Sequence, residues 1–476
     1  MDVHVTLAGR GDLSVRIYRQ LFDAVADGRL RPGERLPPTR ELARRLAVSR
    51  NTVALAYERL AAEGIFEGRV GAGTFVSAVP TARSARRAPS GAALAPRRVW
   101  STLPPAWRGA GPELPPFDFR AGNPDPQLFP YAAWRRLVAR ALRPSSFRET
   151  DYGDPAGHQG LRAAIARHVG VARGVGADAE DVIVTQGAQQ ALDLVGRVLV
   201  EPGTCVAVEE PGYPPARHLF RSLGARVVGV PVDGDGLVVS ALPRAARLVY
   251  VTPSHQFPLG MPMAPARRAA LLAWAEARGA LVIEDDFDSE FRFAGRPLDP
   301  LQNLDRGGRV AYVGSFSKVM LPALRLGFLI APASLQPALR AAKWLSDGHA
   351  PVPTQAALAR FIDGALLARH IRKVARAYQA RHAAIAAALE GPLAPWLRPV
   401  PSAAGLHLAA FAAPGVDVTR VAERAAARGV AVRTLSFFGD GKPAPDGLVI
   451  GYGAIPTARV DEGLRLLRDC FRAARS

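Results

Sequence analysis

Lysine is nearly absent from this sequence. Of the 61 residues that are lysine or arginine, only four are lysine, at positions 318, 343, 373 and 442. Arginine keeps its proton and cannot form an imine, whereas a desolvated lysine can. Lys318, in the run Ser315-Phe316-Ser317-Lys318, is therefore the first candidate for covalent chemistry.

Cysteine and long apolar runs are also scarce. Two cysteines, Cys205 and Cys470, cannot build a disulfide framework and fit a reducing cytoplasm. No apolar run approaches the roughly 18 residues of a membrane span. The first four residues, Met-Asp-Val-His, lack the basic start of a secretory signal. We therefore expect a cytoplasmic protein without a membrane partner.

Length and charge indicate several domains and a polyanionic partner. A chain of 476 residues exceeds what one hydrophobic core usually supports. Its net charge of +19 favours binding to nucleic acid. Residues 1–78 hold 12 arginines against 9 acidic residues, and residues 79–117 hold 6 against one. Most of the excess charge lies elsewhere, so charge supports DNA binding without establishing it.

Residues 1–78 predict three helices and a hairpin. An apolar stripe recurs every four residues over 13–27, which is typical of a helix. Thr39 and Ser49 are the expected N-caps of the next two helices, and Gly64 is expected just beyond the third. Two β-rich runs follow, at residues 65–70 and 74–76. This order predicts an α+β winged helix-turn-helix domain.

The second helix of such a motif enters the major groove of DNA by its N-terminal residues. Three strings, residues 32–43, 48–53 and 71–76, closely resemble the GntR superfamily, and the likeness covers almost all of 13–78. The resemblance implies an operator in double-stranded DNA as the partner. The positions that it assigns to DNA contact are Arg35, Arg40, Ser49, Arg50, Thr52 and Gly73. The alternative is a protein-interaction domain whose arginines are merely solvated.

Beyond residue 78 the sequence changes twice. Residues 79–117 are rich in Pro, Ala, Ser and Arg and predict a semi-extended linker. Residues 118–476 alternate apolar strands with helices, which predicts a doubly wound α/β domain with a small α+β lobe from about residue 370. The expected strands of the α/β part are 182–185, 204–209, 248–252, 281–285, 309–313 and 326–330.

Polar groups follow several of these strands. Asp285 and Asp286 end an apolar strand, where a carboxylate is costly to bury without a cation. Tyr213 lies on a loop beyond another strand, where its ring can stack or simply pack. Gly187-Ala188-Gln189 opens a helix, where backbone N–H groups suit a phosphate, although such turns are often purely structural. Ser315, Ser317 and Arg325 surround Lys318 with further anion ligands.

Together these groups supply what pyridoxal phosphate needs. Lys318 offers the amine, and a carboxylate keeps the pyridine nitrogen protonated so that the ring draws electrons. The strings 152–162, 252–260, 284–286 and 315–318 resemble the aspartate aminotransferase class of fold-type I pyridoxal phosphate enzymes. The resemblance favours Asp285 over Asp286 at the pyridine and adds His255 to the cofactor site. It also implies that Tyr152 reaches the phosphate of a neighbouring subunit in a homodimer. No metal site is predicted.

The fused arrangement resembles the MocR type of GntR-superfamily regulators, above all in 255–258 and 284–291. This implies a transcriptional regulator that senses pyridoxal phosphate, or an amino compound, through an aldimine at Lys318. Two departures argue against tuned catalysis. Phe287 stands where a tyrosine is frequent, and residues 448–452 lack the usual carboxylate-binding arginine, for which Arg433 is a weak substitute. An active aminotransferase with an added DNA-binding domain, or a scaffold without cofactor, are the alternatives.

Overall fold

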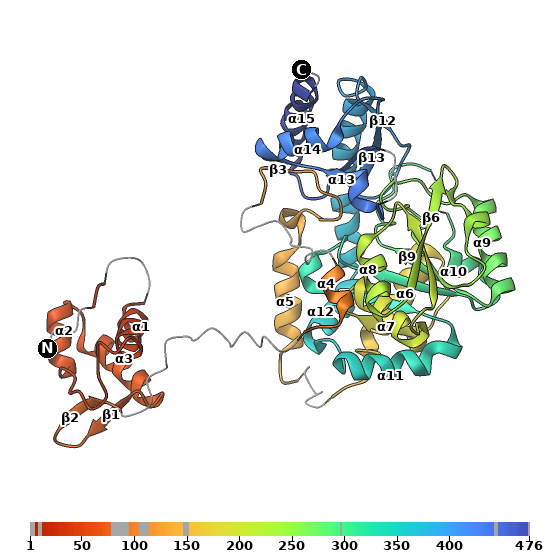
Figure 1. The fold of residues 1–476 in the computed structure, drawn as a ribbon. Coiled ribbons are helices and arrows are strands. Elements are labelled where there is room, and N and C mark those ends of the chain that lie inside the picture. The colour runs from red at the N-terminus through yellow and green to blue at the C-terminus, as the bar shows by residue number, and fades with distance from the viewer. Residues whose placement is uncertain are drawn as a thin grey trace. The chain divides into compact units, whose positions relative to one another are not determined.

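The computed structural model describes residues 5–7, 12–77, 95–103, 114–145, 152–295, 298–441 and 446–474. The chain forms two compact units, Met1–Pro96 and Arg97–Ser476 (Figure 1). Within the described ranges, no helix is long and apolar enough to cross a membrane. Each unit is described by itself below.

The first unit is built from three helices and a two-stranded sheet. Its core contains side chains from every helix, including the fully buried Ile17, Leu42 and Val53. The strands pair antiparallel and close the hairpin that the sequence predicts. The elements are α1 (Leu13–Ala26), α2 (Thr39–Leu46), α3 (Arg50–Ala62), β1 (Phe66–Arg69) and β2 (Gly73–Val76). The predicted winged helix-turn-helix fold is confirmed.

The helix caps of this unit follow the sequence at two of three positions. Ser49 caps α3, since its side chain accepts a hydrogen bond from the Thr52 N–H. Gly64 follows α3 with φ +72°, a conformation that glycine adopts without a Cβ clash. Thr39 was expected to be an N-cap, and that is wrong. The cap of α2 is Pro38, and Thr39 is the first helical residue.

The second unit is organised around an eight-stranded sheet of order β4-β11-β10-β9-β8-β5-β6-β7. Neighbouring strands are parallel except at β11 and β7. The strands are β4 (Val182–Thr185), β5 (Cys205–Glu210), β6 (Arg226–Asp233), β7 (Gly236–Leu237), β8 (Ala246–Val251), β9 (Leu281–Asp286), β10 (Val310–Ser315) and β11 (Gly327–Ile330). The carboxyl ends of β4, β5, β8, β9 and β10 therefore lie at one edge, the usual place for a ligand in such sheets.

Helices cover both faces of this sheet (Figure 1). Successive residues of a strand face opposite sides, so Ile283 packs with α7, α8 and α11 while Val282 packs with α9 and α10. Helices α6 and α12 pack against the β4–β11 end of the sheet, and α5 packs on α12. Their bounds are α5 (Tyr131–Ala141), α6 (Gln159–Arg173), α7 (Ala188–Leu199), α8 (Pro214–Ser222), α9 (Pro265–Arg278), α10 (Leu301–Leu304), α11 (Gln336–Asp347) and α12 (Val352–Asp363).

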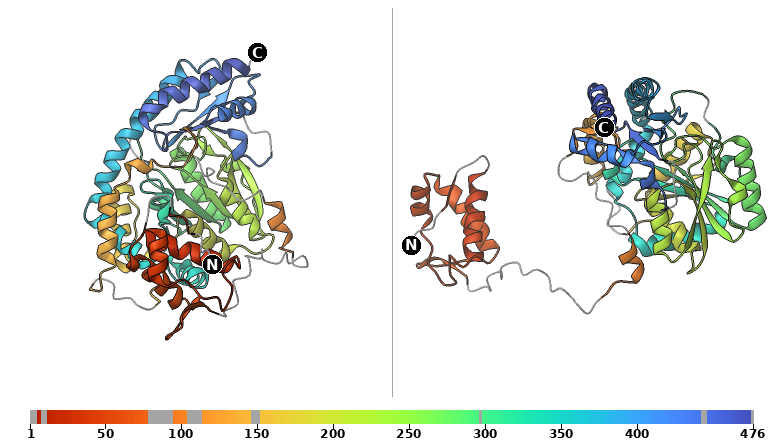
Figure 2. Two further views of the ribbon diagram at one scale, coloured as in Figure 1. Left: turned by 90° about the vertical axis from the view of Figure 1, so that its left-hand side faces the viewer. Right: turned by 45° about the horizontal axis from the view of Figure 1, so that its top comes forward.

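A smaller lobe gathers the C-terminal elements at one end of the second unit, where they are blue in Figure 2. Its four-stranded sheet has the order β12-β13-β16-β15, and β14 pairs with β3 from the start of the domain. The elements are β3 (Phe117–Asp118), α13 (Leu366–Glu390), β12 (Leu397–Pro399), β13 (His407–Ala412), α14 (Val418–Ala427), β14 (Val430–Ala431), β15 (Arg433–Thr434), β16 (Gly447–Gly451) and α15 (Val460–Ala474).

Most of the segment predicted as a linker, residues 79–117, lies outside the described residues. One described part of it is ordered on the second unit. Helix α4 (Arg98–Thr102) contacts α8, and the Arg97 guanidinium donates to the Ser222 carbonyl oxygen at 2.9 Å. The C-terminal part of the expected linker therefore belongs structurally to the second unit.

Candidate cofactor and DNA-binding sites

Lys318 differs from the other described lysines in how its amine is held. Its Nζ donates to the backbone carbonyl oxygen of Gly122 at 2.5 Å, without a carboxylate as hydrogen-bond partner. Lys318 is partly buried, whereas Lys343 is fully buried and forms an ion pair with Asp347, and Lys373 is exposed on α13. Burial lowers the pKa of Lys318, while Asp288 and Asp285 raise it. Lys318 therefore provides an enclosed amine that loses its proton more readily than an ordinary lysine.

The two candidate acids at the end of β9 have different partners. The Oδ2 of Asp286 already has protein partners, because it accepts from Arg173 at 2.8 Å and from the Tyr312 hydroxyl at 2.6 Å. Asp285 accepts only from the Tyr250 hydroxyl, at 2.8 Å, and its buried Oδ1 has no partner. Burial raises the pKa of Asp285 to about 7. The Oδ1 of each carboxylate lacks a protein partner, but only Asp286 forms an ion pair, so Asp285 is the acid whose charge a ligand cation can compensate.

The expected phosphate ligands gather around one turn. Gly187 is the N-cap of α7 with φ +79°, so the N–H groups of Ala188 and Gln189 lie at the open helix end. The Arg325 guanidinium lies over Gly187, where an added Cβ would sit 3.2 Å from Nη1. Ser315 ends β10 and Ser317 follows it, and the Ser315 hydroxyl donates to the Ser317 Oγ at 3.0 Å. Helix end, guanidinium and hydroxyls together form an anion cradle.

Tyr213 lies between the cradle and the acid. It precedes α8, and its ring is 5.8 Å from the Phe257 ring in an edge-on arrangement. Burial, with a smaller contribution from Asp285, raises the pKa of Tyr213 to about 12 against the opposing effect of Arg325. The phenol is therefore within electrostatic reach of both ends of the site, as a residue beside the cofactor ring would be.

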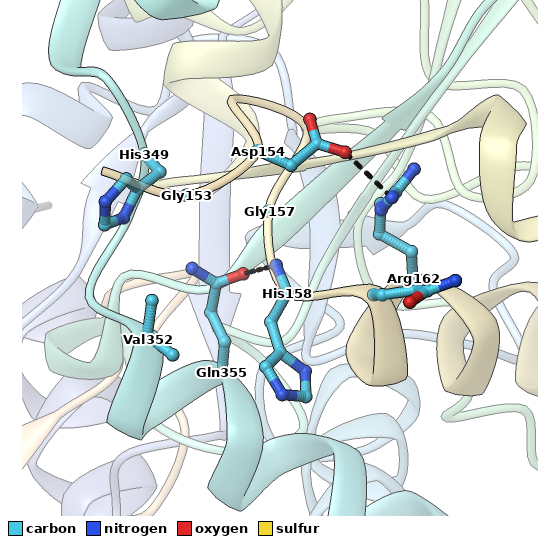
Figure 3. A pocket seen from close by; sticks show the side chains of 9 residues that line it. Gly153, Asp154, Gly157, His158, Arg162, His349, Val352 and Gln355 are labelled. Atoms are coloured by element: carbon cyan, nitrogen blue, oxygen red, sulfur yellow. Dashed lines mark hydrogen bonds and ion pairs between the residues drawn. The ribbon is translucent and has the colours of Figure 1, made fainter. Parts of the chain in front are cut away.

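Tyr152 lies on the surface of the unit, with 88% of its area exposed, and its ring packs against His349. Beside it opens a polar cavity of about 200 Å³ (Figure 3). Figure 3 shows the Asp154–Arg162 ion pair and the His158 N–H donating to Gln355 Oε1. The cavity is lined by Gly153, Asp154, Gly157, His158, Gln159, Arg162, His349, Val352 and Gln355. Neither Lys318 nor Asp285 lines it, so it is separate from the cofactor site.

The two departures from the aminotransferase pattern have visible consequences. Phe287 cannot donate a hydrogen bond, and its ring packs 5.8 Å from the His255 ring. Arg433 pairs with Val449 across β15 and β16, and its guanidinium lies 4.7 Å from the Phe437 ring centre. Arg433 thus stacks on an aromatic ring of its own lobe.

The predicted DNA-contact residues lie on the first unit around α2, α3 and the hairpin. Arg35, Arg40 and Arg50 are exposed, with Arg50 in the first turn of α3. Gly73, at the start of β2, has φ +111°, and a Cβ there would lie 3.1 Å from the Arg35 Nε. The hydroxyls of Ser49 and Thr52 hydrogen-bond each other at 2.8 Å. These two hydroxyls therefore stabilise the end of the helix that carries Arg50.

Comparison with known proteins agrees with both halves of this arrangement. Residues 118–462 match the family Aminotransferase class I and II, and residues 13–76 match Bacterial regulatory proteins, gntR family. The Probable rhizopine catabolism regulatory protein MocR of Rhizobium meliloti is 37% identical, over 98% of this chain and 96% of its own. This chain belongs to the MocR type of transcriptional regulators. The HTH-type transcriptional regulator TauR of Rhodobacter capsulatus is 36% identical over 98% of the chain and 97% of its own.

Solved aminotransferases share the fold of the second unit of this MocR-type chain. The kynurenine aminotransferase of Pyrococcus horikoshii, in complex with PMP, is 28% identical with a TM-score of 0.69, over 75% of this chain and 90% of that one. LysN, an alpha-aminoadipate aminotransferase of Thermus thermophilus, carries N-(5'-phosphopyridoxyl)-L-leucine. It is 30% identical with a TM-score of 0.69, over 75% and 92% of the two chains. The predicted fold class is confirmed.

The residues present fit pyridoxal phosphate, the cofactor of this fold. Asp285 has a buried oxygen without a partner for a pyridine N–H, and Gly187 with Arg325 leaves an open cradle for a phosphate. Lys318 offers an amine that would hold the cofactor aldehyde. When bound, the cofactor supplies an electrophilic carbon and an electron-withdrawing ring.

Sequence reasoning missed several residues around this site. Tyr250 sits within an apolar strand pattern, and nothing in that pattern shows that its hydroxyl reaches Asp285. Asp288 follows β9, Arg173 ends α6 and His407 opens β13, and no local pattern in the sequence indicates that they meet beside β9. His255, which stays a predicted cofactor residue, hydrogen-bonds Asp288 through its Nδ1 at 3.0 Å.

Proposed function

We propose that this protein is a transcriptional regulator that binds operator DNA through its first unit and senses pyridoxal phosphate, or an amino compound, at Lys318. The carrying observation is that the same sheet carries both the Lys318 amine, which donates to the Gly122 carbonyl oxygen, and Asp285, a buried carboxylate without an ion-pair partner among the described residues. Both occur in a chain whose first unit is a winged helix-turn-helix. A regulator of this kind acts on the chromosome, so we place it in the cytoplasm.

In this proposal each group holds a different part of the cofactor. Asp285 accepts the pyridine N–H, and Tyr213 covers one face of the ring. The Gly187–Gln189 turn, Arg325 and the serines 315 and 317 bind the phosphate. The residues at the helix end donate backbone N–H groups, which need no change of protonation state. Lys318 forms the covalent bond, because its lowered pKa keeps more of the amine neutral.

On the DNA side, Arg50 is proposed to contact the major groove from the start of α3. Arg35 and Arg40 contact phosphates and set the position of the unit, and Gly73 lets the hairpin approach the backbone. Phosphate contacts of this kind make binding depend steeply on salt. The sequence selectivity of the protein therefore resides in α3 and its affinity largely in the arginines around it.

We propose a homodimer with Tyr152 completing the site of the second copy. Tyr152 is nine-tenths exposed, and the nearby end of α11 exposes Trp344 and Leu345 by 62% and 77%. Large apolar side chains gathered on a surface are typical of a protein interface. The high exposure of the Tyr152 side chain favours a role across the interface.

The main alternative is a working aminotransferase. The described site offers no arginine on β16, where Val449 faces Arg433, and Arg433 stacks on Phe437. Phe287 withholds a hydroxyl from the cofactor. Measured turnover with common amino donors and keto acids near 1 per second or faster, the ordinary range for enzymes, would favour the alternative.

The deciding experiment measures DNA binding with and without the cofactor. The full-length protein is first used to select a binding sequence from a random duplex pool, and its affinity is then measured by fluorescence anisotropy. We expect pyridoxal phosphate or a candidate amine to change the affinity of the wild type and of Lys373→Ala, whose lysine is exposed. Lys318→Ala should bind the same sequence and show no response. A response that survives in Lys318→Ala would refute the proposal.

A further inference from the structure

A strap of the chain, residues 119–125, contacts the Lys318 amine. The carbonyl oxygen of Gly122, in the middle of this strap, accepts the hydrogen bond that the Lys318 Nζ donates at 2.5 Å. An added Cβ at Gly122 would lie 3.3 Å from the same nitrogen, so the backbone of the strap passes directly beside the amine. Lys318 itself follows β10 of the large sheet. The strap therefore meets the large sheet at its reactive residue.

The start of the strap is bonded to the small lobe. It continues β3, which pairs with β14, and the Phe119 N–H donates to the Ala431 carbonyl oxygen at 2.9 Å. The Phe119 carbonyl oxygen accepts from the N–H of Gly451, the last residue of β16, at 2.7 Å. The Phe119 side chain is fully buried. The first residue of the strap is thus fixed to two strands of the small lobe.

The end of the strap is bonded to α13 by a buried ion pair. The Arg381 guanidinium, which is 2% exposed, donates through Nη2 to the Asp125 Oδ2 at 2.6 Å and through Nη1 to the Gly453 carbonyl oxygen at 2.9 Å. The Asp125 N–H donates to the Tyr378 hydroxyl oxygen at 3.1 Å. Removing one partner of such a pair leaves the other charge buried and unpaired. Arg381 therefore ties Asp125 to the turn that follows β16.

Two glycines of the small lobe let the strap lie against it. An added Cβ at Gly451 would be 2.4 Å from the Arg120 carbonyl oxygen. At Gly453 it would be 2.0 Å from the Asn123 carbonyl oxygen. Neither distance leaves room for a methyl group, so a side chain at either position must displace the strap. The strap thus follows the small lobe on both sides of Gly122.

The bond between the strap and Lys318 depends on hydrogens that the free amine carries. An ammonium offers three N–H donors. When a neutral primary amine condenses with an aldehyde, its two hydrogens leave with the carbonyl oxygen as water and a C=N double bond forms. The nitrogen then keeps no hydrogen, or one if it is protonated. Covalent bonding at Lys318 therefore removes or weakens the donor that Gly122 accepts from.

We propose that the strap is a built-in cap on the free Lys318 amine, and that Arg381 is the positioning residue that holds it there. The cap deepens the proposed function and takes its biological meaning from it, because covalent bonding at Lys318 is the event that releases the strap. A ligand biases a conformational equilibrium only if it interacts differently with the two states. The lost N–H donor is that difference, and the small lobe receives it through the strap.

The link is reciprocal, so it can be measured from either end. The first measurement is the acetylation rate of each lysine in the full-length protein without cofactor, by competitive labelling with acetic anhydride and peptide mass spectrometry. Gly453→Ala should accelerate the labelling of Lys318 about tenfold or more, because a hydrogen bond from an ammonium is lost and the amine is uncovered. Lys343, which is fully buried in the same unit, should keep its rate.

Two further variants separate the strap from the rest of the small lobe. Gly447→Ala is the matched control on β16, since its Cβ would be 2.3 Å from the Ala410 carbonyl oxygen and none of its nearest neighbours belongs to the strap. It should leave the labelling of Lys318 unchanged. Asp125→Asn removes the charge that Arg381 pairs with and should accelerate the labelling, as Gly453→Ala does.

The second measurement is hydrogen exchange of the same cofactor-free protein in the peptide that covers residues 119–125. Lys318→Met keeps an unbranched side chain without a donor, and it should accelerate exchange there about tenfold. Lys343→Met, which also removes a buried lysine from this unit, should leave the peptide unchanged. In a Gly453→Ala background Lys318→Met should add nothing, because the strap is already displaced.

Several results would overturn the cap. Equal acceleration of Lys318 labelling by Gly453→Ala and Gly447→Ala would show that the amine responds only to general loosening of the small lobe. Unchanged labelling in Gly453→Ala, or unchanged exchange of the strap in Lys318→Met, would show that the strap and the amine are independent. If Gly453→Ala does not fold, Asp125→Asn takes its place in both measurements, and an unchanged Lys318 rate would then refute the proposal. Both measurements are made without cofactor, so they stand or fall separately from the proposed function.

Discussion

Exchanging the Asp285 carboxylate for an amide should stabilise the free protein and weaken its binding of pyridoxal phosphate. In the free protein Asp285 is a buried carboxylate whose Oδ1 has no partner, and its pKa is raised from 3.8 to about 7. A pKa raised to that degree corresponds to a penalty on the order of 4 kcal/mol for the ionised form. Asp285→Asn removes this penalty and keeps an acceptor for the Tyr250 hydroxyl. We therefore expect the free variant to melt at a higher temperature than the wild type above about pH 7.

The sign of the pH dependence provides a second check. A carboxyl group whose pKa is raised on folding makes the folded state bind the proton more tightly. Its contribution to stability is therefore lost as the pH rises from about 4 to about 7. The melting temperature of the wild type should fall as the pH rises over this range, and that of Asp285→Asn should fall less.

The same substitution should weaken cofactor binding. A charge-assisted hydrogen bond to the pyridine nitrogen contributes about 1.5–3 kcal/mol, so Asp285→Asn should weaken pyridoxal phosphate binding by about 10- to 150-fold. Asp286→Asn is the matched control, since the neighbouring carboxylate pairs with Arg173. Breaking that buried pair should lower the melting temperature of the free protein. Both variants are compared by thermal melts and by titration of the cofactor absorbance.

Comparing Asp285→Asn with Asp286→Asn shows which of the two carboxylates is the pyridine partner. Weaker cofactor binding in Asp286→Asn, with nearly unchanged binding in Asp285→Asn, would show that the pyridine partner is wrongly assigned. A free Asp285→Asn protein that melts below the wild type would show that the carboxylate is compensated in the free protein after all.

Three further predictions concern the DNA-binding unit and the amine. Ser49→Ala should lower the free energy of unfolding of the first unit by about 1 kcal/mol, measured by urea denaturation, because Ser49 caps α3. Arg50→Ala should weaken the sequence preference, because Arg50 is proposed to contact the major groove; an equal loss of affinity for all sequences, with the slope of log affinity against log salt reduced by about 1, would place it on a phosphate and contradict this. The rate at which Lys318 bonds to pyridoxal phosphate should rise with pH about a midpoint below that of ordinary lysine. Asp288→Asn should move this midpoint lower still, since Asp288 raises the pKa of Lys318, and a midpoint that rises would contradict the electrostatic argument.

Local signals in the sequence predicted much of the fold. Ser49 and Gly64 mark the ends of α3 because caps are set by one or two residues. The apolar strands of the large sheet were found because buried parallel strands are continuous runs of apolar residues. β6 was missed, since Gly229 and Pro231 interrupt its pattern. Thr39 was misplaced because Pro38 occupies the cap itself.

The site was predictable only in part, for a physical reason. Lys318 and the turn at Gly187 follow strands and Asp285 lies at the end of one, so one edge of one sheet brings them together. The contact between His255 and His407 joins residues from two lobes, and no local pattern reports it. The same holds for the preference of Asp286 for Arg173, which leaves Asp285 available. Partners that are distant in sequence become known only from the tertiary structure.

The central claim is that Lys318 bonds covalently to pyridoxal phosphate in a protein that binds DNA. The most direct measurement is borohydride reduction of the full-length protein after incubation with pyridoxal phosphate, followed by peptide mass spectrometry. We predict one stable phosphopyridoxyl group on Lys318 and none on Lys343 or Lys373. A label on another lysine, or no label on a protein that still binds its DNA, would contradict the account.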